Sequence, residues 1–306
     1  MAQKVVLICD PGIDGAFAIA IALCDPQLDV VGILATPGNV DADRATKNVR
    51  IVLDQIDPPR WPRLGAGPNV QYEVDGRSLH GPGGLGNTDF PCVSLHHLPP
   101  SEKLLVELAR QHPNELTVIC MGPATVLARA LDICADLPHL LKRIVLVGGA
   151  MNEPGNAGPV SEFHFFCDPV AARRALHCEM PVMLVPLDMM RQVLYSPSEL
   201  LAADTALSPV FHFLRQITPY GIAATSSRYG IEGFHLKDVL GIAAVALPEA
   251  ATTKMMSVDV ETQGELTLGM TVFDKRTWHT ATTNVSVLLE MNHKAIRQYV
   301  KRTIGY

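Results

Sequence analysis

Short apolar runs alternate with longer segments of helical periodicity along most of the chain. Runs rich in β-branched residues predict buried strands, at residues 4–9, 30–35, 116–121, 143–147 and 182–185. The segments between them have the composition and spacing of helices, at residues 14–24, 41–55, 124–131 and 169–177. Strands that alternate with helices indicate a parallel sheet covered on both faces. We therefore predict an α/β fold with an open, doubly wound, mostly parallel sheet.

The rest of the chain is less regular. Residues 79–91 are rich in glycine and proline, which predicts an irregular functional loop. Residues 196–247 have a mainly helical pattern, residues 256–273 are rich in strand formers, and a last helix is expected at 291–301. Because no repeat, low-complexity tract or linker interrupts the chain, we expect a single domain, residues 1–306, with a helical excursion around 196–247.

Composition narrows the class of protein. The formal net charge is -6 and no run of Lys or Arg occurs, so we expect no nucleic-acid partner. No stretch approaches the roughly 18 apolar residues of a membrane helix, so we expect no membrane partner. Seven scattered cysteines without a CxxC pair predict a reducing, cytoplasmic location. A charged fraction of 18% is low for a solvated monomer and indicates a subunit interface or a thick core.

Acidic residues follow the first predicted strand. Asp10 and Asp14 bracket the turn Pro11-Gly12, which allows both carboxylates to project over the strand end. Asp14 could equally cap the following helix. Asp10 lies directly behind a buried run, where a charge needs a partner, water or a cation. A phosphatase of the haloacid type would need its second aspartate where Gly12 stands.

Six short motifs resemble, in order, those of the inosine-uridine preferring nucleoside hydrolases. The first loop, Cys9 to Asp14, resembles the family signature D-x-D-P-G-x-D-D. The others are Gly38-Asn39-Val40 (G-N-V), His80-Gly81 to Gly86 (H-G-x-x-G-L-G), Gly122 to Thr125 (G-P-L-T), Gly155-Asn156 with Glu162-Phe163 and Asp168-Pro169 (G-N…E-F-N…D-P), and Lys237-Asp238 (H-D-P). Each motif is weak alone, but their order along most of the chain identifies it as a member of this family.

The resemblance implies a metal-assisted N-ribohydrolase with the nucleoside hydrolase fold. By carry-over, Asp10 is the general base and a ligand of a calcium ion, together with Asp238 and the backbone carbonyl of Thr125. Side chains from the matched motifs are expected to bind the ribonucleoside, namely Asp14, Asn39, His80, Asn156, Glu162, Phe163 and His164. Hard oxygen ligands suit calcium. The resemblance also implies a homodimer or homotetramer.

This sequence departs from the family pattern at the site itself. Ile8 and Gly15 stand where the family has the first and last aspartates of its signature, and His164 and Lys237 replace an asparagine and a histidine. Calcium usually takes about six to eight oxygens, so the missing carboxylate at Gly15 leaves a poor cage. We therefore predict a catalytic Lys237: the cation here is its ammonium or a weakly held metal. Alternatively, Lys237 points to solvent.

Two functions follow from these residues. The first is hydrolysis of the N-glycosidic bond of a ribonucleoside, with Asp10 activating water. The second is a catalytically impaired homologue that binds a ribosyl ligand without efficient turnover. His164 could contact the ligand or merely pack, and His235 could be an acid for the leaving base or a surface residue. Tyr229 and residues 226–228 are expected to form a lid.

Overall fold

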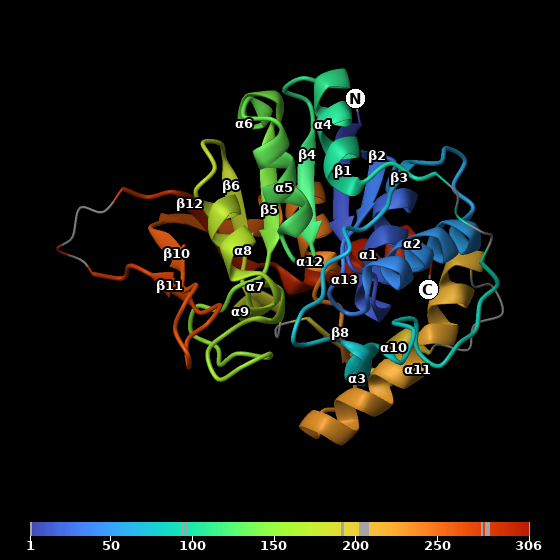
Figure 1. The fold of residues 1–306 in the computed structure, drawn as a ribbon. Helices are drawn as coiled ribbons and strands as arrows, with labels where there is room; N and C mark the ends of the chain where they lie inside the picture. The colour runs from blue at the N-terminus through green and yellow to red at the C-terminus, as the bar shows by residue number, and fades with distance from the viewer. Residues whose placement is uncertain are drawn as a thin grey trace.

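The centre of the molecule is an eight-stranded sheet (Figure 1). The computed structural model describes residues 2–92, 95, 97–190, 193–201, 208–276, 278 and 282–305. The sheet has the order β3-β2-β1-β4-β5-β6-β12-β9, and every neighbouring pair is parallel except β12 with β9. Its strands are β1 (Gln3–Cys9), β2 (Leu28–Ala35), β3 (Arg63–Gly65), β4 (Thr117–Met121), β5 (Arg143–Val147), β6 (Val182–Val185), β9 (Ala251–Met256) and β12 (Val285–Met291). The predicted mostly parallel, doubly wound sheet is confirmed.

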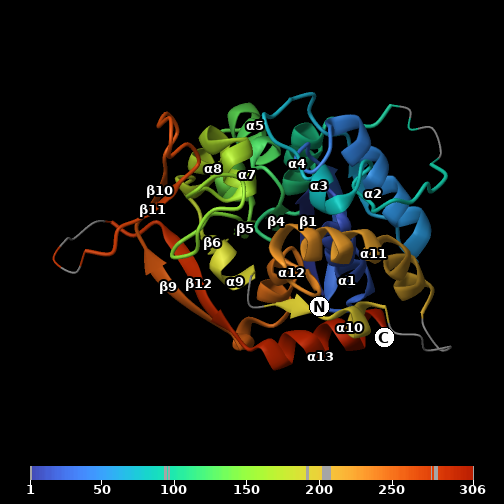
Figure 2. The same cartoon turned by 90° about the horizontal axis from the view of Figure 1, so that it is seen from below.

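Helices cover both faces of this sheet (Figures 1 and 2). One face carries α1 (Ile13–Cys24), α2 (Ala42–Ile56), α12 (Val239–Ala246) and α13 (His293–Ile304), and the other carries α4 (Ser101–Gln111), α5 (Thr125–Ile133), α6 (Leu137–Leu140) and α8 (Pro169–Leu176). Leu7 of β1 belongs to the first core and Ile8 to the second. Because both faces are buried, the strand is a continuous apolar run rather than an alternating one.

The strand order places a ligand site at one edge of the sheet. β1 lies between β2 and β4, so the chain order reverses there. Asp10 follows β1, Asn39 lies in the loop after β2, and Thr125 begins the helix after β4. Because parallel strands end at the same edge, these three loops meet at the switch point where such sheets bind ligands.

The remaining elements surround that edge. They are α3 (Arg77–His80), α7 (Phe163–Cys167), α9 (Leu187–Met190), β7 (Leu194–Tyr195), α10 (Pro197–Leu200), α11 (Pro209–Tyr229), β8 (Phe234–His235), η1 (Pro248–Ala250), β10 (Val258–Val260) and β11 (Thr271–Phe273). The long helix α11 packs beside α3 (Figures 1 and 2). The predicted helical region contains α10, α11 and α12 and also the short strand β8, which pairs with β7 just before the region. Among the described residues, no helix is both long and apolar enough for a membrane span.

Two free thiols lie in the strands beneath the site. Cys9 ends β1 and Cys120 lies in the adjacent strand β4, and both side chains are fully buried. Burial raises the pKa of Cys9, and it raises the pKa of Cys120 to about 12. Both therefore pack as small neutral groups.

Candidate active site

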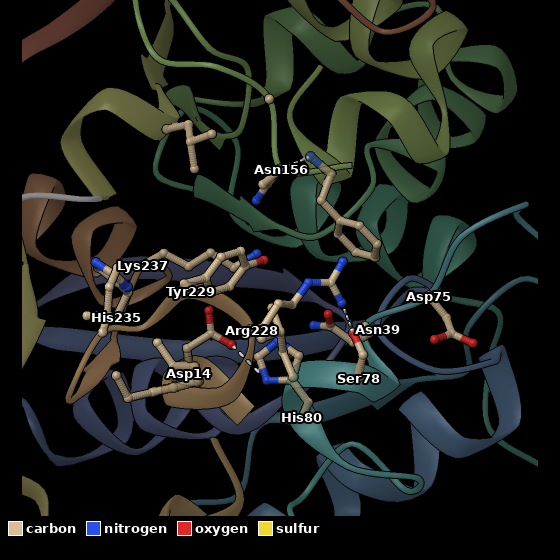
Figure 3. Close-up of a pocket in the computed structure, with 18 of the residues that line it drawn as sticks. Asp14, Asn39, Asp75, Ser78, His80, Asn156, Arg228, Tyr229, His235 and Lys237 are labelled. Carbon is tan, nitrogen blue, oxygen red and sulfur yellow. Dashed lines mark hydrogen bonds and ion pairs between the residues drawn. The ribbon is translucent and has the colours of Figure 1, made fainter. Parts of the chain in front are cut away.

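A cavity of about 630 Å³ lies above the carboxyl ends of the central strands. Its inner lining comes from five separate loops and helix starts, and includes Asp14, Asn39, His80, Asn156, Phe163 and Lys237 (Figure 3). A cavity of this size suits a small molecule with a few polar groups. The matched motifs, far apart in sequence, are therefore brought to one cavity.

The outer rim of the cavity joins α3 to the end of α11. Arg228 Nη1 donates a hydrogen bond of 2.7 Å to Ser78 Oγ, and the Arg228 guanidinium lies 5.7 Å from the centre of the Tyr229 ring. Asp75 and His235 also line the cavity (Figure 3). The sequence interpretation expected a lid at residues 226–229 but missed Asp75 and Ser78. The one sequence feature that could have identified Asp75 and Ser78 is their position just before the motif that begins at His80.

Asp10 is held by the loop that follows β2. Its Oδ2 accepts the Asn39 backbone N–H at 2.7 Å, and Asn39 Nδ2 donates to the Asp10 carbonyl at 3.0 Å. A Cβ at Gly38 would lie 2.0 Å from Asp10 Oδ2, so this approach requires glycine. Burial raises the pKa of Asp10, while Lys237 and the Asn39 N–H oppose the rise. Oδ1 has no hydrogen-bond partner in the described chain.

Asp14 and His80 form the floor of the cavity on the side of α1. His80 Nδ1 accepts the backbone N–H of Ile13 at 3.1 Å and lies 3.7 Å from Asp14 Oδ1. Burial lowers the pKa of His80 to about 4. Near neutral pH the ring is therefore uncharged, with its proton on Nε2, and the contact with Asp14 is not an ion pair.

Glu162 and His164 lie beneath the cavity at the start of α7. Glu162 Oε2 accepts the backbone N–H groups of His164 at 2.9 Å and Phe165 at 3.2 Å, which caps the helix. His164 Nδ1 lies 2.9 Å from the Val147 carbonyl, and a carbonyl can only accept. Its Nε2 is then an acceptor, 3.8 Å from Asp10 Oδ1. Burial lowers the pKa of His164, so the ring is neutral.

Thr125 and Asn156 hold neighbouring segments in place. The Thr125 hydroxyl donates to Asp168 Oδ2 at 2.5 Å and therefore accepts from Tyr72 Oη, 2.6 Å away. Asn156 Oδ1 accepts the backbone N–H of Phe163 at 2.7 Å. The hydrogen bonds of Thr125 connect α5 to the start of α8. The hydrogen bond of Asn156 holds the loop before α7 beside the cavity.

Lys237 faces the cavity, next to Asp238 at the start of α12. Its Nζ lies 5.7 Å from the centre of the Phe163 ring. Burial alone would lower the pKa of Lys237, but surrounding carboxylates outweigh burial and raise it above its ordinary value. These carboxylates are Asp14, Asp238, Glu162 and Asp10. Lys237 is therefore an ammonium in an acidic centre, and does not point to bulk solvent.

The carboxylates of this centre fit calcium poorly. Asp10 Oδ1, Glu162 Oε1 and Asp238 Oδ1 are buried without hydrogen-bond partners in the described chain, which suits some cation. However, no three His, Cys, Asp or Glu side chains of the described residues converge as metal ligands. A Cβ on Gly15 would lie 3.3 Å from Asp238 Oδ2, so a carboxylate at Gly15 would stand beside Asp238. Without it, the oxygen cage that calcium needs is incomplete.

The predicted site residues thus occupy two levels. Asp14, Asn39, His80, Asn156, Phe163 and Lys237 line the cavity. Asp10, Glu162, His164 and Asp238 are at most 1% exposed and lie below it. Thr125 lies at the edge of the group, bound to Asp168. The roles that the resemblance gives these residues stay predictions.

Comparisons with known proteins agree with this arrangement. The sequence profile of the family described as inosine-uridine preferring nucleoside hydrolase matches residues 5–298. The inosine-uridine preferring nucleoside hydrolase of Leishmania major is 32% identical over 282 residues, which cover 90% of this chain and 89% of that protein. The non-specific ribonucleoside hydrolase RihC of Escherichia coli is 30% identical over 310 residues, covering 100% and 99%.

A solved structure gives the same result for the fold. The plant nucleoside hydrolase PpNRh1 superposes with a TM-score of 0.91 at 26% identity, and the match covers 100% of both chains. The profile spans nearly the whole chain, and the cavity lies at the sheet edge where the matched motifs converge. The chain belongs to the inosine-uridine preferring nucleoside hydrolase family.

Proposed function

We propose that this protein hydrolyses the N-glycosidic bond of a ribonucleoside, with Asp10 as the general base. The orientation of Asp10 carries the proposal. Asn39 fixes one carboxylate oxygen, Oδ2, and leaves Oδ1 buried without a partner. Burial raises the pKa of this carboxyl, which makes it a stronger base near neutral pH.

The reaction transfers one proton to Asp10. Water attacks the anomeric carbon of the ribose as Asp10 Oδ1 removes a proton from it, and a new C–O bond forms. The bond to the base breaks, and the base leaves with the electron pair and takes up a proton from solvent, while Asp10 later returns its own proton to solvent. Positive charge develops on the sugar during this step, and the negative field of Asp14 and Glu162 stabilises it.

The cavity supplies the binding contacts for this substrate. Asp14 in the first turn of α1 and Asn39 in the loop after β2 offer acceptors and donors for ribose hydroxyls. The rim formed by Ser78, Arg228 and Tyr229 offers an aromatic face and hydrogen-bond donors for the leaving base. The sugar therefore binds at the sheet edge and the base toward α11.

Release of free base tests the proposal. Protein from a host that lacks its own nucleoside hydrolases is incubated with purine, pyrimidine and nicotinamide ribosides, and the free base is measured by chromatography. We expect release from at least one substrate and a loss of about 100-fold or more in Asp10→Asn, since a general base contributes about that much. Asp43→Asn, on the exposed side of α2, is the matched control and retains full activity. Equal rates in Asp10→Asn and the control would refute the role of Asp10.

One observation favours a second function, ribosyl binding without efficient turnover. Asp10, Glu162 and Asp238 lie below the cavity, and Lys237 stands in its lining. A binding protein of this kind retains affinity for ribose but releases no base from any riboside on the panel. That result, with and without added calcium, would replace the enzymatic proposal with this one.

A further inference from the structure

We propose that the ammonium of Lys237 takes the place of the divalent metal ion in this centre, so that ribosyl ligands bind without calcium. The inference rests on the proposed ribosyl site but does not require turnover. It follows from where Lys237 lies, from what surrounds it and from what is missing at Gly15.

Lys237 lines the cavity, and Asp10 and Asp238 are buried carboxylates outside that lining. Each of these two side chains is only 1% exposed. Both have an oxygen without a hydrogen-bond partner in the described chain. A ligand entering the cavity therefore meets the ammonium before it meets these two carboxylates.

The ammonium also disfavours a metal ion. A divalent ion at Asp10 and Asp238 would add positive charge to a centre that already holds the Lys237 ammonium, and like charges repel in a buried site. The described chain offers the ion no cluster of three ligand side chains, and Gly15 leaves the position beside Asp238 without a carboxylate. The missing carboxylate and the added positive charge both lower the affinity of this centre for a divalent ion.

Helix starts help to support the acidic groups that remain. Asp14 lies in the first turn of α1, Glu162 at the N-cap of α7 and Asp238 at the N-cap of α12. The positive ends of helix dipoles stabilise carboxylates at such positions. The centre therefore depends less on a doubly charged ion than four clustered carboxylates alone would suggest.

An ammonium can perform the binding part of the metal's task. It carries three N–H donors, which reach sugar hydroxyls as charge-assisted hydrogen bonds. The same charge attracts the carboxylates that accept hydrogen bonds from those hydroxyls. Lys237 thus links the ligand to the acidic centre with one charge and no exchangeable ion.

The first experiment measures binding of D-ribose, which is not consumed, by the shift it causes in the melting temperature. We expect the same shift for wild-type protein in EDTA and in calcium, and no shift from calcium alone. Lys237→Gln should weaken ribose binding at least about tenfold, because charge-assisted hydrogen bonds are lost. Lys103→Gln, an exposed lysine of α4, is the matched control and binds ribose normally.

The second experiment rebuilds the metal site. In Gly15→Asp combined with Lys237→Gln, we expect calcium to raise the melting temperature and to restore ribose binding, whereas calcium restores nothing in Lys237→Gln alone. A wild-type protein whose ribose binding is lost in EDTA and returns with calcium would overturn the inference. So would a double variant that folds but does not respond to calcium.

If the double variant does not fold, the comparison of wild type with Lys237→Gln decides the matter. The two proposals fail separately. Ribose binding that resists EDTA and is lost in Lys237→Gln supports the role of Lys237 even if no riboside is hydrolysed. Base release that needs calcium overturns the role of Lys237 and leaves the hydrolase intact.

Discussion

At the scale of single residues, both buried histidines of the site have one ring nitrogen committed to the backbone. His80 accepts from Ile13, and His164 donates to Val147. Each ring therefore has a fixed tautomer and presents its second nitrogen in a defined role: His80 Nε2 as donor and His164 Nε2 as acceptor. Both rings stay neutral because burial lowers their pKa.

The lowered pKa of His80 should make the free energy of unfolding depend on pH. The folded pKa of about 4 lies below the unfolded value of about 6.5, so the unfolded chain takes up the proton first as the pH falls. The free energy of unfolding should therefore decrease from about pH 6.5 to about pH 4, by about 3 kcal/mol in total. Urea titrations of wild type and His80→Gln measure this as a difference between the two proteins. A difference that does not change with pH would contradict the prediction.

At the scale of elements, the glycine-rich loop between α3 and α4 depends on one glycine. Gly86 has φ of +69°, and its backbone N–H donates to the His80 carbonyl at 2.7 Å. A Cβ there would lie 2.6 Å from the carbonyl oxygen of Ile217 in α11. The absence of a side chain at Gly86 therefore allows the backbone of this loop to pack directly against the backbone of α11.

Two alanine substitutions separate the causes of this requirement. Gly230 has a similar φ of +65°, but a Cβ there meets nothing within 4 Å. Gly230→Ala should cost about 1 kcal/mol from the left-handed backbone alone. Gly86→Ala should cost about 3 kcal/mol, because overpacking against α11 is added. Urea unfolding of both variants tests this; equal costs would show that the contact with Ile217 relaxes freely.

The elements also show what the sequence could and could not predict. Strands β5 and β6 have the bounds that their apolar runs predicted, since strands buried on both faces read as continuous runs. Helix α4 and strand β12 were not predicted. The first follows the short helix α3 and is not preceded by a predicted strand, and the second pairs with β9 by a long-range contact that no local pattern reports.

The same limit applies to the site. Asp10 and Asp14 could be predicted as site residues from the sequence, because the local turn at Pro11-Gly12 decides where their side chains project. Whether Lys237 faced the cavity or solvent depended on the packing of α12, which the sequence alone did not contain. His164 lies outside the cavity lining, beside Asp10, and its contact with the ligand stays a prediction.

At the scale of the whole molecule, the last helix is tied back to the first. Tyr299 Oη of α13 donates a hydrogen bond of 2.6 Å to Asp25 Oδ2, at the end of α1, and both residues are at most 5% exposed. Asp25 lies at the far end of α1 from Asp14. This contact therefore closes the fold without touching the cavity.

Removing the hydroxyl should affect stability and not activity. Tyr299→Phe leaves a buried carboxylate oxygen without its donor, which costs about 1–3 kcal/mol. Urea unfolding measures the cost, and base release or ribose binding should be unchanged from wild type. A change in ribose binding would mean that α13 and the cavity are coupled through α1.

The two buried thiols beneath the site, Cys9 and Cys120, can report on openings of the sheet. They lie in the neighbouring strands β1 and β4, where Cys9 packs into one core and Cys120 into the other, and an alkylating reagent can reach them only when that part of the sheet opens. Their rate of modification in native buffer therefore reports how often β1 and β4 open, as amide exchange does for backbone groups. A ligand that binds only the closed protein lowers the population of the open state, so it should slow the alkylation of both thiols.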